Sequence, residues 1–167
     1  MRENAVVFLK EKPVYFSAHP PRDLALFLIR AEQEPDISTR GRLLRHAVNE
    51  WPQELDAHIL LYKFLFFHGR HLEAERAVLA AMSEAARQGG FTRNYRRLTP
   101  QTADWLENPS MSRVYLFSLK ALGVVRLRRG RVADAERVLT KLLELDPQDE
   151  IGGRNFLDIA TSFREQE

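Results

Sequence analysis

The side chains best able to do chemistry in this sequence are five histidines, and no cysteine accompanies them. His68 and His71 are three residues apart, but Gly69 lies between them, so a shared helical face does not follow from the spacing. The other histidines are His19, His46 and His58. Without a thiolate or an HExxH motif, this spacing is too loose to predict a metal site. We therefore expect no metal and no cofactor.

The acidic side chains are also poorly placed for catalysis. They recur in amphipathic stretches close to arginines, as Glu73 and Glu75 do beside Arg76, and this pattern is typical of surface ion pairs. The glycine pairs at 89–90 and 152–153 lack the lysine and the spacing of a phosphate-binding loop. No GxSxG element is present either. The sequence predicts a protein that is not an enzyme.

Residues 87–97 offer binding chemistry, because they hold four arginines and two aromatic residues without one acid. Arginine contacts phosphates while an aromatic ring stacks on a base. The residues concerned are Arg87, Phe91, Arg93, Tyr95, Arg96 and Arg97. A solvated loop or a contact with an acidic protein explains the pattern equally well, and nucleic-acid binders usually carry a wider positive surface. Nucleic-acid binding by this basic loop is therefore the weaker alternative.

Composition places the chain among ordinary globular proteins. Its 167 residues are 44% hydrophobic and 29% charged, which suits one core without metal or disulfide. The formal charge is only +2, so the protein as a whole has little pull on nucleic acid. No apolar run approaches the roughly 20 residues of a membrane span, and Ala5–Leu9 is too short for a secretory signal. We expect a cytoplasmic protein with no membrane partner, and the excess of arginine over lysine suits a GC-rich bacterial genome.

An internal repeat decides the fold. Residues 69–76 (GRHLEAER) are echoed by residues 130–137 (GRVADAER), and in each copy an apolar segment precedes the glycine and an amphipathic segment follows it. Glycine after the last apolar residue provides a left-handed helix end, and the small Ala74 or Ala135 allows the second helix to approach the first. The repeated unit is therefore helix, glycine turn, helix.

The second copy resembles the tetratricopeptide repeat family over residues 116–149. The positions that carry the resemblance are Leu119, Leu122, Gly123, Gly130, Ala135, Leu139 and Pro147. The same register gives a unit at 55–88 and a weaker one at 21–54, where Arg40 stands in place of alanine. The resemblance implies an all-α fold, an α-α superhelix in which antiparallel helix pairs form a right-handed array.

The remaining segments complete one domain over residues 21–167. Residues 89–115 break the spacing as an insertion, in which we expect a short helix from Thr99 to Glu107 that buries Trp105 and Leu106. Residues 150–167 predict the capping helix that covers the last face of a repeat array. Residues 1–20 form an N-terminal arm, read either as two short strands or as an irregular segment.

In the tetratricopeptide repeat family, the first helices of successive units line a concave groove that takes a segment of a partner. Carried over to this chain, the groove is lined by Arg22, Ala25, Ile29, Ile59, Lys63, Phe66, Phe67, Phe117, Lys120, Val124 and Arg128. Apolar residues fill places where some family members hold a C-terminal carboxylate, so that mode is not expected here. The aromatic residues fit an amphipathic helix or a hydrophobic strand, and the lysines attract acidic flanks.

Two other interpretations of the groove residues stay open. Apolar stripes on helices usually face the core, and the arm, residues 1–20, can itself cover them. Our leading expectation is a non-catalytic adaptor or chaperone-like module that binds another protein in this apolar groove. Self-association as a homodimer through an exposed repeat face is a further alternative.

Overall fold

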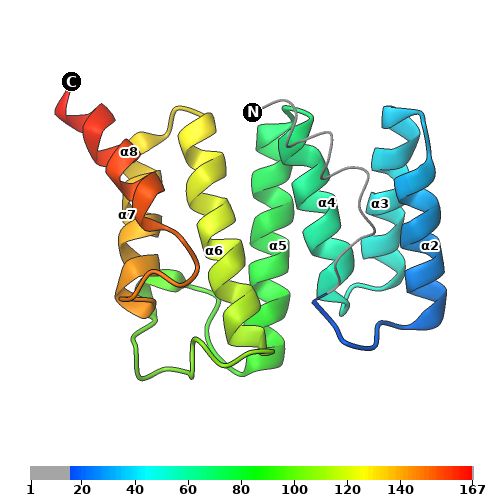
Figure 1. The fold of residues 1–167 in the computed structure, drawn as a ribbon, viewed down its shortest axis with the longest axis horizontal. Helices are drawn as coiled ribbons and strands as arrows, with labels where there is room; N and C mark the ends of the chain where they lie inside the picture. The colour runs from blue at the N-terminus through cyan, green and yellow to red at the C-terminus, as the bar shows by residue number, and fades with distance from the viewer. Residues whose placement is uncertain (1–15, 167) are drawn as a thin grey trace.

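The computed structural model describes residues 16–166, and this part of the chain is all-helical, with no β-strand. The helices stand side by side in a row, each beside the next one in the chain (Figure 1). They are α2 (Arg22–Gln33), α3 (Ile37–Glu50), α4 (Leu55–Phe67), α5 (His71–Gly89), α6 (Met111–Arg128), α7 (Val132–Leu145) and α8 (Arg154–Glu165). The predicted all-α class is confirmed. The strands considered for the N-terminal arm fall almost entirely outside the described residues, which begin at Phe16.

The α4–α5 and α6–α7 turns have the same backbone geometry. Each contains a glycine in the left-handed region, with φ of 73° at Gly69 and 74° at Gly130, where other residues are strained. The backbone amide of the residue after each glycine donates to a carbonyl five residues earlier in the chain. In the first turn, the Arg70 nitrogen lies 2.9 Å from the Leu65 carbonyl oxygen. Arg131 makes the matching bond in the second turn, also at 2.9 Å. This arrangement ends a helix and reverses the chain, so the predicted helix, glycine turn, helix unit is confirmed in both copies.

Small residues let neighbouring helices approach one another. Ala74 and Ala135 are fully buried, as their places in the two repeats predict. In the first pair the corresponding residue is Arg40, which is not small, and the next residue, Gly41, faces the second pair instead. A Cβ added to Gly41 would lie only 2.9 Å from the ring of Phe64, so α3 contacts α4 through a bare backbone. The weak first repeat therefore keeps its helix pair without a small residue at the matching place, and its glycine serves the contact between pairs.

The segment between α5 and α6 differs most from the prediction. The irregular part spans residues 90–110 and is shorter than the expected insertion at 89–115, because α5 ends at Gly89 and α6 begins at Met111. The helix predicted from Thr99 to Glu107 is wrong, since this stretch forms turns. A short 3-10 helix, Tyr95–Arg97, lies just before it in a region expected to be loop.

The carbonyl of Thr99 explains why no α-helix starts there. It accepts from the Thr102 amide at 3.0 Å and from the Trp105 indole at 2.9 Å. Both acceptor positions of this oxygen are therefore used by partners that an α-helix would not supply. Trp105 is buried, as predicted, whereas Leu106 is half-buried. A buried side chain, and not helix propensity, decides the local structure.

The predicted capping helix is present as α8, which packs against α7. It begins at Arg154, later than the expected start at residue 150, because the preceding turn is organised by a buried carboxylate. Asp146 is fully buried, and its Oδ2 accepts from the Ile151 amide at 2.8 Å. Ala160 is the fully buried residue of α8. The helix covers α7 with a small side chain and leaves larger ones at its rim.

One ion cluster joins α5 to α6. Glu75, expected to form a surface ion pair, has a side chain only 10% exposed and pairs with both Arg126 and Arg129. Its oxygen accepts from Arg126 Nε at 2.8 Å. The side chains of the two arginines are 19% and 23% exposed. One carboxylate therefore compensates two guanidiniums that water reaches only in part.

We expect Glu75→Gln to lower the free energy of unfolding by about 3 kcal/mol, because it leaves two poorly solvated guanidiniums without a counter-charge. For a chain of this size the melting temperature should fall by about 10 °C. The matched control is Glu73→Gln on the same helix, whose pairs to Arg45 and Arg70 are 40–49% exposed and should contribute under about 1 kcal/mol. Urea unfolding followed by circular dichroism measures both, and equal losses would contradict a special role for Glu75.

Candidate binding groove

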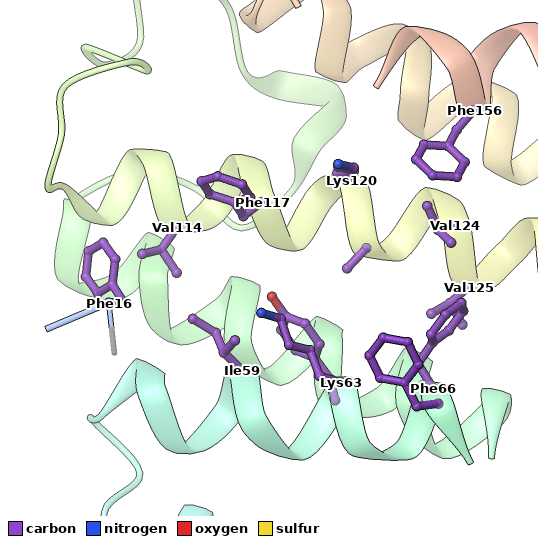
Figure 2. Close-up of a pocket in the computed structure, with 13 residues that line it drawn as sticks. Phe16, Ile59, Lys63, Phe66, Val114, Phe117, Lys120, Val124, Val125 and Phe156 are labelled. Atoms are coloured by element: carbon purple, nitrogen blue, oxygen red, sulfur yellow. The ribbon is translucent and has the colours of Figure 1, made fainter. Parts of the chain in front are cut away.

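A groove of about 570 Å³ runs between α4 and α6, with Phe16 at one end and Phe156 of α8 towards the other (Figure 2). Its lining is almost wholly apolar, and the described residues in it include two lysines and no acid. The lining consists of Phe16, Ile59, Tyr62, Lys63, Phe66, Phe67, Val114, Phe117, Lys120, Ala121, Val124, Val125 and Phe156. It is thus a strongly apolar concave surface.

Most of the predicted groove residues lie together here. Those that do are Ile59, Lys63, Phe66, Phe67, Phe117, Lys120 and Val124. Ile29 lies on α2 and is 39% exposed, outside the groove. Arg128 is exposed at the last residue of α6, and neither Arg22 nor Ala25 is among the lining residues. The groove therefore belongs to the second and third helix pairs, and the first pair does not extend it.

Several residues that line the groove were not predicted from the sequence, for two different reasons. Val114 and Ala121 share the helical stripe of Phe117 and Val124, with spacings of three and four residues, so helical periodicity could have found them. Phe156 carries no such signal. It enters the groove only because the packing of α8 on α7 brings it beside α6.

The two lysines of the groove are held in partly dry surroundings. Lys120 Nζ donates to the Ile151 carbonyl at 3.0 Å and lies 5.7 Å from the ring centroid of Phe156. Lys63 is half-buried, and this burial lowers the pKa of its ammonium. A positive charge that has lost part of its water attracts a carboxylate more strongly than one on the open surface. The groove is therefore suited to a segment with an acidic side chain.

Two large aromatic side chains stand open at the groove. Phe67 is 47% exposed and Phe117 is 45% exposed. The ring of Phe66 contacts that of Phe67 edge to face, with centroids 5.8 Å apart, and the Arg113 guanidinium lies 5.6 Å from the centroid of Phe117. These contacts fix the rings without covering them. Apolar surface held rigid in this way is typical of anchor residues at protein interfaces.

A buried carboxylate fixes the chain at the entrance of the groove. Asp56, in the first turn of α4, is 3% exposed. Its two oxygens accept from the backbone amides of Phe16 and Ser17. Burial raises the pKa of Asp56, although both hydrogen bonds act against the shift. Asp56 therefore places the ring of Phe16 against Ile59 and Val114 (Figure 2).

The basic loop, residues 87–97, directs its aromatic rings inward. Tyr95 is 9% exposed, and Phe91 packs edge to face on Trp105 with centroids 5.1 Å apart. Arg87 pairs with Glu84 at 2.6 Å. All four arginines of the segment are exposed, namely Arg87, Arg93, Arg96 and Arg97. The loop thus offers charge but no exposed ring for a base, and nucleic-acid binding stays a prediction.

Two of the histidines have backbone carbonyls as partners. His58 Nε2 lies 2.7 Å from the Pro52 carbonyl, and His68 Nδ1 lies 2.8 Å from the Phe64 carbonyl. Across residues 16–166, no three histidine, aspartate or glutamate side chains gather where they could hold a metal ion. Within the same residues, no helix combines the length and apolarity that crossing a bilayer requires.

The raised pKa of Asp56 predicts a pH dependence with a definite sign. The folded protein holds this proton more tightly than the unfolded chain, so the contribution of Asp56 to stability is full below about pH 4 and is lost as pH rises through its folded pKa. We expect the stability of the wild type relative to Asp56→Asn to fall over this interval.

Asp36→Asn is the matched control, because hydrogen bonds from Thr39 lower the pKa of Asp36. Stability gained from Asp36 is present above its unfolded pKa and is lost as pH falls. The wild type relative to Asp36→Asn should therefore gain stability as pH rises. Urea unfolding at a series of pH values between about 3 and 7 measures both slopes, and slopes of the same sign would refute the assignment for Asp56.

Comparison of the chain with protein-family models, with curated proteins and with solved structures finds no match.

Proposed function

We propose that this protein is a non-catalytic binding module that holds a segment of a partner protein in the groove between α4 and α6. The observation that carries the proposal is the lining: apolar side chains, two partly dehydrated lysines and no acid among the described residues. An apolar concave surface with a few polar groups is the usual form of a recognition site. The resemblance to the tetratricopeptide repeat family supports it, since in that family the first helices of successive units, here α4 and α6, line the partner groove.

Burial of the exposed rings would supply most of the affinity. Phe67 and Phe117 each keep nearly half of their surface in water, so covering either one contributes on the order of 2 kcal/mol. Together the two anchors contribute about 4 kcal/mol, so burial of the remaining apolar lining must add to them to meet the cost of association.

The lysines would select among apolar segments. A segment that places a carboxylate beside Lys63 or Lys120 adds a charge interaction in an apolar lining, where water screens it little. The partner segment we propose is thus apolar at its centre and acidic at its flanks. An adaptor or chaperone-like role in the cytoplasm follows as part of the proposal, because a chain without cysteine suits a reducing compartment.

Site-specific photo-crosslinking tests the location of the partner. A photoreactive phenylalanine at Val124, which lines the groove, should form a covalent adduct with one partner in cells. The same residue at Leu79, exposed on α5 outside the groove, should not capture that partner. Mass spectrometry of the adduct identifies the segment. Adducts with a second copy of the chain would instead favour self-association, and equal capture at both positions would contradict a groove site.

The binding energy is tested on the captured segment as a synthetic peptide. We expect Phe67→Ala combined with Phe117→Ala to weaken binding by about 100- to 1000-fold, because each substitution removes an anchor. Leu79→Ala, a change at an equally exposed apolar residue, should leave affinity unchanged. Isothermal titration calorimetry measures the affinities, and circular dichroism confirms that each variant is folded. An unchanged affinity in the double variant would sink the proposal.

A further inference from the structure

We infer that in the free protein the groove is occupied by the chain's own N-terminal segment, residues 1–15, which a partner segment must displace. The occupancy stands on the geometry of Phe16, Asp56 and the groove. Only the displacement rests on the proposed function. Before a partner arrives, this segment would cover the exposed rings of Phe67 and Phe117.

The described part of the chain begins at the groove. Phe16 is itself a lining residue at one end of the groove (Figure 2), and its backbone amide is held by the buried carboxylate of Asp56. Ser17 is bonded to the same carboxylate at 3.1 Å. Two hydrogen bonds to one buried charged group are a strong fixation point. The residue that comes directly before Phe16 must therefore start at the mouth of the groove.

The N-terminal segment is long enough to follow the whole groove. The groove follows α6, which has 18 residues and is about 27 Å long. The 15 residues that precede Phe16 span at most about 50 Å when extended. The segment can thus reach the far end of the groove, where Phe66 and Phe156 lie (Figure 2). Because the segment is tethered to the groove through Phe16, its effective concentration at the groove is in the millimolar range.

The N-terminal segment also contains the apolar residues that an apolar groove favours. Ala5–Leu9 is a run of five apolar residues, and Val14 adds another close to the tether. A run of this kind is poorly placed in water when an apolar groove lies within its reach. Burying it against Phe67 and Phe117 removes apolar surface from water on both partners.

Charge makes the segment a weak occupant. Arg2, Lys10 and Lys12 outnumber Glu3 and Glu11 in residues 1–15, so the segment gains little from the lysines of the groove. Its binding is apolar and should respond little to salt. A partner with acidic flanks is also attracted by the positive charge of the lysines, and can therefore displace the segment despite its tether. The chain's own N-terminal segment therefore covers the groove but can be displaced from it.

The absence of cysteine from the chain provides a direct test. In full-length Val124→Cys, the introduced thiol lines the groove, and its rate of labelling by a maleimide reports how often the groove is open. Val7→Lys with Phe8→Lys in the same chain should raise this rate about tenfold or more, because the two added ammonium groups cannot be buried in an apolar lining beside two lysines, and the segment no longer stays bound. Leu79→Cys, exposed on α5 outside the groove, should label at the same rate with either N-terminal segment.

Two further readouts keep the test decisive. A synthetic peptide of residues 1–15, added to the variant that carries Val7→Lys, Phe8→Lys and Val124→Cys, should slow labelling back towards the original rate. Added sodium chloride should not release the protection. Labelling that is unchanged by Val7→Lys with Phe8→Lys, or unaffected by the peptide, would overturn the inference. Either result leaves the crosslinking experiment on the partner untouched, so the two proposals can fail separately.

Discussion

The small-residue face of α5 is the constraint on which the rest of the molecule depends. This helix packs against both α4 and α6, and the buried face it presents includes Ala77, Ala81 and Ala85. Short side chains bring the backbones of both neighbours close, so that α4 and α6 stand near enough to share one groove. The ion cluster of Glu75 then fixes α6 against α5 at a defined height. A larger residue in this face would move the two walls of the groove apart.

The same two helices serve as core and as binding surface, and this shapes the chemistry of the groove. Leu61 and Leu65 of α4 are buried in the core, whereas Phe67, two positions later, is nearly half exposed. The hydrophobic pattern of α4 consequently goes almost all round the helix. Lysine tolerates such a place because its long alkyl stem packs on apolar neighbours while the ammonium reaches water. The groove thus remains compatible with the free protein while keeping charges that discriminate among partners.

Local rules predicted the parts of the fold that depend on local geometry. A left-handed turn needs glycine, so Gly69 and Gly130 announce the helix pairs, and Ala74 and Ala135 follow as contact residues. Such rules failed where a distant side chain decides. The turn at Thr99 depends on an indole six residues away, which no capping pattern reveals.

Prediction of the groove divides in the same way. Helical periodicity combined with the repeat register placed Phe66 and Phe117 correctly, because both lie on first helices of adjacent pairs. Phe16 and Phe156 come from the two ends of the described chain, and their presence depends on how those ends fold back. Ile29 was placed in the groove by register alone and lies outside it. Register assigns a helix face, but only packing decides where the concave surface stops.

The positions of the two tryptophans have an optical consequence. Trp51 packs beside Phe27 in the first helix pair, with ring centroids 5.7 Å apart, and Trp105 is buried in the segment between α5 and α6 beside Phe91. Neither indole is among the residues that line the groove. Their emission therefore reports separately on the first helix pair and on the 90–110 segment, and it is silent about groove occupancy. A change in tryptophan fluorescence would signal partial unfolding at one of these two places, even while the groove itself stayed intact.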